Sequence, residues 1–296
     1  MRRRSRPAST SSESISPDCS SGDFKLLTEA EAIRAAIHQR TNLATSQFRG
    51  AIRPIYRESR QTFTHVGSCT LVEFGGSRWI VTAAHVIDQH IANLSVGGSK
   101  NLVPLEGDFH GTAAPGGIRD DDKFDFSAAV VTDRMAEDLG DVRYIGEEFI
   151  SKGRRTDEGR PMYTCVGYPN SRNKDIHAAN RHVGVRLFSH TSFGYSKWPQ
   201  LTQWAEGTEA HMFVEYGKYG ATALGDKRNA KNPKGASGGP VFYIGQFGEL
   251  DTYRHDANYQ PMLEAIIIRL PPNGGALVSV KMAVIIDAMK KAGLSK

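Results

Sequence analysis

Gly235-Ala236-Ser237-Gly238-Gly239-Pro240 is followed directly by the apolar run Val241-Phe242-Tyr243-Ile244. A serine between glycines, just before a strand-like run, is typical of a nucleophile on a tight loop. Glycines allow the backbone to turn sharply and bring its N–H groups close to a reacting carbonyl. An ordinary Gly/Ser turn has the same composition. A nucleophile therefore requires that the chain also supply a base and an orienting carboxylate.

A histidine suited to the role of base follows a predicted β-hairpin. Residues 67–74 and 78–82 are two strand-like runs joined at Gly75-Gly76, which is typical of a hairpin. The second run leads into Thr82-Ala83-Ala84-His85, whose small residues leave room around the imidazole. Histidine has the unperturbed pKa that suits a general base near neutral pH. We therefore predict that His85 is the base, although most of the 10 histidines are expected to be structural.

The predicted carboxylate follows an acidic run. Residues 120–122 are three consecutive aspartates, which we expect to form a solvated loop exterior. Asp125 lies between Phe124 and Phe126, directly before an apolar run, so we expect it to be partly buried. A buried carboxylate needs a polar partner. The Nδ1–H group of His85 would satisfy it and would hold the imidazole in the tautomer that catalysis needs.

The composition limits the classes of function. A chain of 296 residues, 39% of them hydrophobic, can form one large domain or two packed subdomains. No apolar run approaches the ~20 residues of a membrane span, and the basic N-terminus lacks the apolar segment of a secretory signal. Of the net charge of +5, four units come from Arg2, Arg3, Arg4 and Arg6, which leaves +1 for residues 7–296. Four arginines give only a weak attraction to nucleic acid or an acidic membrane, so no nucleic-acid partner is expected.

The three cysteines indicate a reduced protein. Cys19, Cys69 and Cys165 form no CxxC pair and have no histidine at metal-ligand spacing, so neither a metal site nor a cofactor is predicted. An odd number of cysteines without an export signal favours free thiols and a cytoplasmic location. Cys69 and Cys165 lie in apolar runs, and we expect both to be small core residues.

Sequence patterns divide the chain into a tail, a helix and a β region. Residues 1–21 are polar and predicted to be a disordered tail. Residues 22–49 are predicted to be a helical extension, in which Thr28 and Glu31 have the spacing of a capping box. A C-terminal helix is expected over residues 279–291. Further strands are expected near residues 101–105, 126–132, 162–168, 183–193, 210–216, 240–244 and 263–270.

Many short strands with almost no helix between them favour an all-β barrel or sandwich. In chain order, His85, Asp125 and Ser237 resemble the catalytic residues of chymotrypsin-like (trypsin-fold) serine peptidases of the bacterial type. The matching segments are residues 82–85, 124–128, 166–169, 235–240 and 263–269. The resemblance implies two antiparallel six-stranded β-barrels with the site in the cleft between them. The first barrel would span residues 50–150, and the second, with Ser237 and the C-terminal helix, residues 151–296.

The same resemblance implies a serine endopeptidase that acts through an acyl-enzyme on a protein or peptide substrate. Ser237 would be the nucleophile, His85 the general base and then acid, and Asp125 the carboxylate that orients the imidazole. The backbone N–H groups of Gly235 and Ser237 would form the oxyanion hole. Such an enzyme needs no metal and no cofactor.

Several residues depart from the pattern of secreted members of this family. Ala236 stands where those members carry an aspartate that pairs with a newly cut N-terminus, and Val86 replaces a disulfide cysteine. The strand that would line the substrate pocket ends in Ile268-Arg269, without the usual Ser-Trp-Gly. Lys231 stands at the expected base of the pocket, where it would favour acidic or polar side chains unless it belongs to a solvated loop.

Other functions fit parts of the sequence. Residues 235–239 also match the G-x-S-x-G elbow of α/β-hydrolases, but that fold requires serine, acid and histidine in this order. His255 is the one histidine after Ser237, and strands do not alternate with long helices, so we exclude this fold. The alternative to an active peptidase is a latent or inactive module that binds a protein partner in its cleft. Residues 24–49 are a candidate for docking a regulatory protein or restraining the site.

Overall fold

The computed structural model describes most of the chain between Thr28 and Leu294. The described residues are 28–60, 62–88, 93–153, 161–171, 173, 176–177, 186–195, 198, 207–217, 219–221, 227–229, 232–246, 259–271 and 275–294. The predicted tail (residues 1–21) with Cys19, the first part of the strand expected over 183–193, and Lys231 lie outside these residues.

The N-terminal part of the β structure is an antiparallel sheet built around the long strand β2 (Thr62–Phe74). The strand order is β5 (Leu102–Pro104), β4 (Leu94–Gly97), β1 (Ile52–Ser59), β2, β3 (Ser77–Ala83), β7 (Phe126–Val130) and β6 (His110–Gly111), with β9 (Ile176–His177) paired to the start of β2. The prediction of a closed six-stranded barrel is not confirmed here, because the described strands form an eight-stranded sheet that does not close. Its edge strands β5 and β6 are three and two residues long, which leaves few backbone groups for closure.

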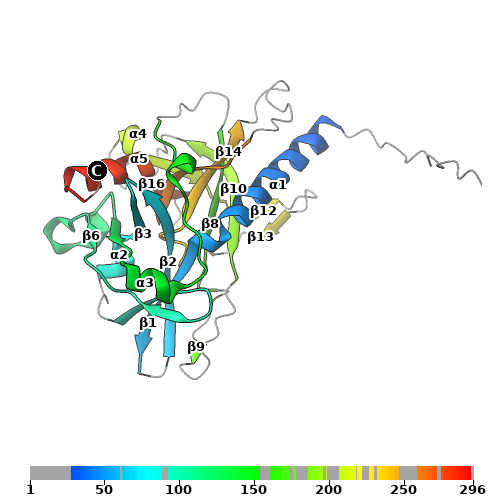
Figure 1. Cartoon of the computed structure of the whole chain (residues 1–296). Helices are drawn as coiled ribbons and strands as arrows, with labels where there is room; N and C mark the ends of the chain where they lie inside the picture. Colours follow the sequence, from blue (N-terminus) through cyan, green and yellow to red (C-terminus); the bar gives the residue numbers. More distant parts are fainter. Residues whose placement is uncertain are drawn as a thin grey trace, which may run out of the picture.

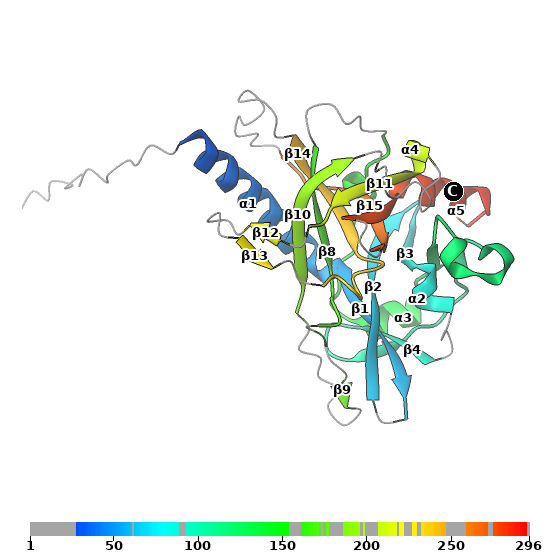
Figure 2. The same ribbon diagram turned by 180° about the vertical axis from the view of Figure 1, so that it is seen from behind.

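The C-terminal part forms a closed six-stranded antiparallel barrel, as predicted (Figures 1 and 2). Its strands, in order around the barrel, are β10 (Phe188–Tyr195), β11 (His211–Glu215), β16 (Ala276–Lys281), β15 (Met262–Arg269), β14 (Pro240–Gln246) and β8 (Pro161–Gly167). Strands β12 (Tyr219–Ala221) and β13 (Lys227–Asn229) form a separate pair. The apolar run after the Ser237 turn is β14, which pairs with β8 on one side and β15 on the other.

The segment around residue 150 contacts both β units. The carbonyl of Ile145 accepts from the N–H group of Glu73 at 2.8 Å, and the N–H group of Ser151 donates to the carbonyl of Leu263 at 2.9 Å. Buried residues of both units also belong to one continuous hydrophobic core. The division into domains at residue 150 therefore stays a prediction.

The predicted hairpin at Gly75-Gly76 carries His85 to its position. Both glycines have positive φ, at 58° and 73°, and they join β2 to β3. Strand β3 pairs with β7 so that Ala83 lies opposite Phe126. The short helix α2 (Ala84–Asp88) begins immediately after β3. This register places His85, two residues beyond Ala83, beside the residue that precedes β7.

The predicted helical extension contains the helix α1 (Glu29–Phe48), which lies against the barrel along β8, β10 and β14 (Figures 1 and 2). Thr28 and Glu31 form the predicted capping box. Arg40 donates to the carbonyl of Ile244 at 3.0 Å. Phe48 stacks on Phe242 with ring centroids 5.0 Å apart. Packing on the barrel, in addition to the cap, therefore stabilises the helix.

The remaining helices are short. They are α3 (Asp133–Leu139), α4 (Gly207–Ala210) and α5 (Met282–Lys291), with 3₁₀ turns η1 (Arg49–Ala51), η3 (Pro115–Gly117), η4 (Arg119–Asp121) and η5 (Glu147–Phe149). The C-terminal helix begins later than predicted, because residues 279–281 pair with β15 as the end of β16. None of the helices in the described ranges combines the length and the apolar character that crossing a membrane requires.

Cys69 and Cys165 are buried free thiols, as predicted. Burial raises the pKa of Cys69 to about 12 and also raises the pKa of Cys165. Both side chains are therefore protonated at neutral pH and act as small core residues.

We predict that Phe48→Ala lowers the free energy of unfolding by about 3–5 kcal/mol, because it removes a buried ring that contacts Phe242 and Phe149. Leu43→Ala, which truncates a 40% exposed side chain on the same helix, is the control and is expected to change stability by less than about 1 kcal/mol. Urea unfolding followed by circular dichroism measures both. Equal effects of the two substitutions would show that α1 is not anchored through Phe48.

Candidate active site

A cleft of about 980 Å³ is lined by both His85 and Ser237. The N-terminal unit contributes Asp88 and the loop that contains Ile118, whereas the barrel contributes Asn170 and the end of β15. The floor on the barrel side is apolar and is formed by Ile267, Ile268, Leu270 and Leu277. The cleft therefore brings together two of the three residues predicted to be catalytic.

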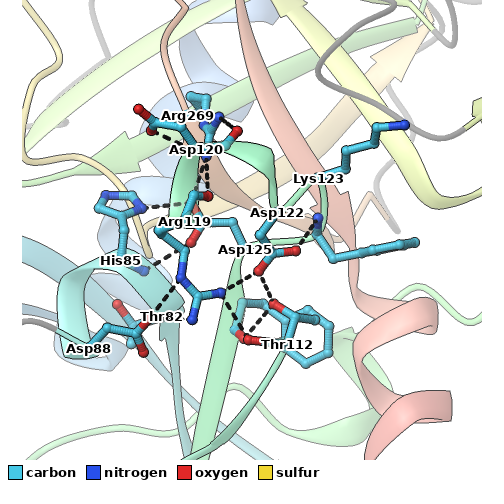
Figure 3. Close-up of polar contacts among 12 residues, drawn as sticks. Thr82, His85, Asp88, Thr112, Arg119, Asp120, Asp122, Lys123, Asp125 and Arg269 are labelled. Carbon is cyan, nitrogen blue, oxygen red and sulfur yellow. Dashed lines mark hydrogen bonds and ion pairs between the residues drawn. The ribbon is translucent and has the colours of Figure 1, made fainter. Parts of the chain in front are cut away.

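Asp125, the third residue predicted to be catalytic, holds the side chain of His85 in place (Figure 3). The Nδ1 atom of His85 lies 2.7 Å from Oδ2 of Asp125, and the backbone N–H group of His85 donates to Oδ1 at 2.9 Å. An ionised carboxylate can only accept, so the ring proton resides on Nδ1 and Nε2 presents a lone pair. The side chain of His85 is 34% exposed and lines the cleft. The imidazole thus has the tautomer that a general base requires.

Asp125 has no exposed surface and an unusual backbone conformation. Its φ is +42°, a region that residues other than glycine rarely adopt. The carbonyl of Asp125 accepts from the N–H group of Ala84 at 2.9 Å. Backbone and side chain therefore both bond to the start of α2, and these contacts hold the strained residue in place.

The acidic run before Asp125 is not uniformly solvated, which corrects the prediction. Asp120 is exposed, but Asp122 is buried. The carboxylate of Asp122 accepts from the hydroxyl of Thr112 and from the guanidinium of Arg119 (Figure 3). Arg119 also donates through Nε to Asp88 at 2.7 Å. Compensation by this arginine makes burial of the carboxylate tolerable.

The turn that carries Ser237 is fixed by the neighbouring strands. Gly235 and Gly238 have φ of 95° and 87°, which favours glycine. Ser68 on β2 donates through Oγ to the carbonyl of Gly235 at 2.9 Å and through its N–H group to the carbonyl of Ser237 at 2.8 Å. Gly238 donates to the carbonyl of Ile267 at 2.7 Å. Within the described part of the chain, the N–H groups of Gly235 and Ser237 donate no hydrogen bond, so both are available to a ligand.

Two residues beside this turn were not predicted from the sequence. His65 on β2 and Asn170 lie against Gly235, where an added Cβ would overlap Oδ1 of Asn170 and lie 2.9 Å from Cε1 of His65. His65 Nδ1 lies 2.6 Å from Asn170 Oδ1. The N–H group of Asn170 donates to the carbonyl of Lys234 at 2.7 Å. Asn170 follows the matched segment 166–169, which is the one local signal that could have identified it, whereas nothing local marks His65.

The predicted pocket residues have different environments. Ile268 is buried and lines the floor of the cleft. Arg269 also lines the cleft, but its guanidinium is directed to the loop that precedes Asp125, where Nη1 donates to the carbonyl of Asp120 at 2.8 Å (Figure 3). Lys234 is an exposed cation at the cleft. A cationic pocket base at Lys231 stays a prediction, since this residue lies outside the described ranges.

No group of three or more His, Cys, Asp or Glu side chains that could hold a metal ion occurs among the described residues.

Comparison with known proteins matches this chain to solved structures at 8–13% identity and TM-scores of 0.44–0.48. No family model matches the sequence, and no curated protein is similar to it in sequence. Among similar solved structures, the thermostable serine protease AL20 of an extremophilic microorganism has 13% identity and a TM-score of 0.44, covering 81% of this chain and 94% of that chain. The VesB protease of Vibrio cholerae has 11% identity and a TM-score of 0.48, and the match covers 84% of this chain and 65% of that chain. The tobacco vein mottling virus protease has 8% identity and a TM-score of 0.44, and the match covers 81% of this chain and 82% of that chain.

We predict that Gly235→Ala distorts the turn, because the new Cβ would overlap Asn170 and the residue would keep a positive φ. Because Gly235 is predicted to supply an oxyanion donor and Ser237 is predicted to be the nucleophile, reaction with a fluorophosphonate, a reagent for activated serines, is expected to slow about 100-fold or more. Gly116→Ala is the control, since Gly116 also has positive φ, of 58°, but no atom lies within 4 Å of its added Cβ. An unchanged rate in Gly235→Ala would contradict the role assigned to the turn.

We predict that His65 makes stability depend on pH. Burial lowers the pKa of His65 from 6.5 to about 4, with a smaller opposing effect of its bond to Asn170. Between these values the unfolded chain binds a proton that the folded chain does not, so stability falls as the pH falls from 6.5 to 4. The loss attributable to His65 is up to about 3 kcal/mol.

Urea unfolding at a series of pH values measures this effect. His65→Gln is expected to lose less stability than the wild type over the same interval, while His38→Gln, which removes an exposed imidazole, controls for the loss of a histidine. Parallel curves for His65→Gln and the wild type would contradict the assignment.

Proposed function

We propose that this chain is a serine endopeptidase with Ser237 as nucleophile, His85 as base and Asp125 as orienting carboxylate. The observation that carries the proposal is the 2.7 Å contact between His85 Nδ1 and Asp125 Oδ2, in a cleft that Ser237 also lines. An imidazole with its proton fixed on Nδ1 can accept a proton from a serine hydroxyl through Nε2. The cleft of about 980 Å³ runs between the two β units, and a protein or peptide chain is the substrate class that we propose for it.

In the proposed reaction, Ser237 Oγ attacks the carbonyl carbon of a peptide bond while its proton passes to His85 Nε2. The charge on the carbonyl oxygen is then stabilised by the N–H groups of Gly235 and Ser237, each worth on the order of 3 kcal/mol. When the C–N bond breaks, His85 returns the proton to the leaving amine. Water, activated by the same imidazole, attacks the acyl-enzyme and restores Ser237.

A latent or inactive module that binds a protein in this cleft is the second candidate. The apolar floor and the exposed Ile118, 56% of whose surface is accessible, favour binding of an aliphatic segment. A regulatory partner on residues 24–49 stays a proposal. The described part of this segment does not line the cleft but contacts β14, the strand that follows the Ser237 turn, and this contact is a route by which such a partner would act on the turn.

The test is labelling with a fluorophosphonate probe, followed by hydrolysis of a casein substrate. We predict that Ser237→Ala and His85→Ala abolish both, with a loss for Ser237→Ala of about 10⁶-fold in turnover. Ser99→Ala, at an exposed serine, is the matched control and is expected to behave as the wild type.

The labelled site is then located by mass spectrometry. Labelling at a serine other than Ser237 would contradict the proposal. A folded wild type that binds peptides but neither labels nor hydrolyses would favour the second candidate.

A further inference from the structure

Arg269 connects the barrel to the residue that orients the imidazole. It is the last residue of β15, and its side chain is 14% exposed. Its guanidinium donates to two carbonyls of the N-terminal unit, that of Asp120 from Nη1 at 2.8 Å and that of Arg119 from Nη2 at 3.2 Å. The same Nη2 lies 3.7 Å from Oδ2 of Asp125 (Figure 3).

Asp125 needs a compensating cation. It has no exposed surface, and both of its side-chain hydrogen bonds come from His85. A buried carboxylate next to a neutral imidazole is an uncompensated charge, which is strongly unfavourable. Among the described residues, Arg269 provides the one lysine or arginine group within 4.0 Å of this carboxylate.

The shape of the guanidinium suits this position. Its planar fork presents several N–H groups in one fixed geometry to two carbonyl groups and a carboxylate, whereas the ammonium group of lysine is compact and lacks this fixed geometry. The two carbonyls belong to the turn η4, which precedes Asp125 by a few residues. Arg269 therefore places a positive charge near the carboxylate of Asp125 and also holds the loop on which the position of Asp125 depends.

We propose that Arg269 is a positioning residue that holds Asp125 in line with His85 from across the cleft. This role rests on the proposed function of the site. It differs from the role of a pocket residue that recognises an acidic substrate, because it acts on the reactivity of Ser237 toward any reagent.

The experiment compares the fluorophosphonate reaction rates of Arg269→Met, Arg269→Lys and Arg269→Ala with that of the wild type. A fluorophosphonate with an alkyl chain offers no acidic group to Arg269, so the rate reports positioning alone. Arg269→Met is expected to react about 10- to 100-fold more slowly, and Arg269→Lys to recover part of the loss. Arg134→Met, at an arginine whose side chain is 77% exposed, is the matched control and is expected to be unchanged.

Rescue distinguishes positioning from general damage to the fold. Added methylguanidinium, far below denaturing concentrations, is expected to raise the rate of Arg269→Ala in a saturable manner and to leave the rate of Arg134→Ala unchanged. A rate for Arg269→Met equal to that of the wild type overturns the proposal. The proposal is also overturned if neither the Arg269→Lys substitution nor added methylguanidinium restores any of the lost reaction rate.

A spectroscopic measurement separates this proposal from the proposed function. The downfield proton resonance of His85 Nδ1 reports the bond to Asp125 without any reaction at Ser237. We expect this resonance in the wild type and in Arg134→Met. In Arg269→Met we expect it to be lost or shifted. If the wild type does not react with the probe, the function fails, whereas an unchanged resonance in Arg269→Met overturns the role of Arg269.

Discussion

Burial of the Asp125 carboxylate is the constraint on which the geometry of the site depends. A charge without access to water has to be satisfied by fixed groups, and those groups come from both halves of the chain. His85 follows strand β3, and Arg269 ends β15 of the barrel. Because both reach the same carboxylate, the position of the imidazole follows from how the two β units pack.

The sequence predicts the local parts of this structure well. The Gly75-Gly76 hairpin, the capping box of α1 and the strand after the Ser237 turn depend on residues close together in the chain, and the structure contains all three. The sequence also predicts the contact of His85 with Asp125, because a carboxylate expected to be buried needs a polar partner, and the resemblance of motifs implies the same pairing. The assignment of Ser237, His85 and Asp125 to catalysis stays a prediction.

The features that sequence reasoning missed depend on distant partners. Asp122 belongs to an acidic run whose composition predicts exposure to solvent. The residue is buried, and the guanidinium of Arg119 in the folded loop compensates its charge. His65 and Asn170 are separated by 105 residues, and no periodicity connects them. Strand β1 is not among the strands expected from the sequence, and Pro54 interrupts its pattern. The described strands of the first sheet do not close into a barrel, and its edge strands β5 and β6 are only three and two residues long.

The bonds around the Ser237 turn also determine when it can exist. Ser68 from β2 donates to two carbonyl groups of the turn, and the N–H group of Gly238 donates to Ile267 of β15. Asn170 packs against the turn at Gly235. A chain emerging from the ribosome therefore contains the serine well before it contains all the strands that give the turn its form. The turn can take this form only once β15 is present and paired, so that an incomplete chain carries the motif without its geometry.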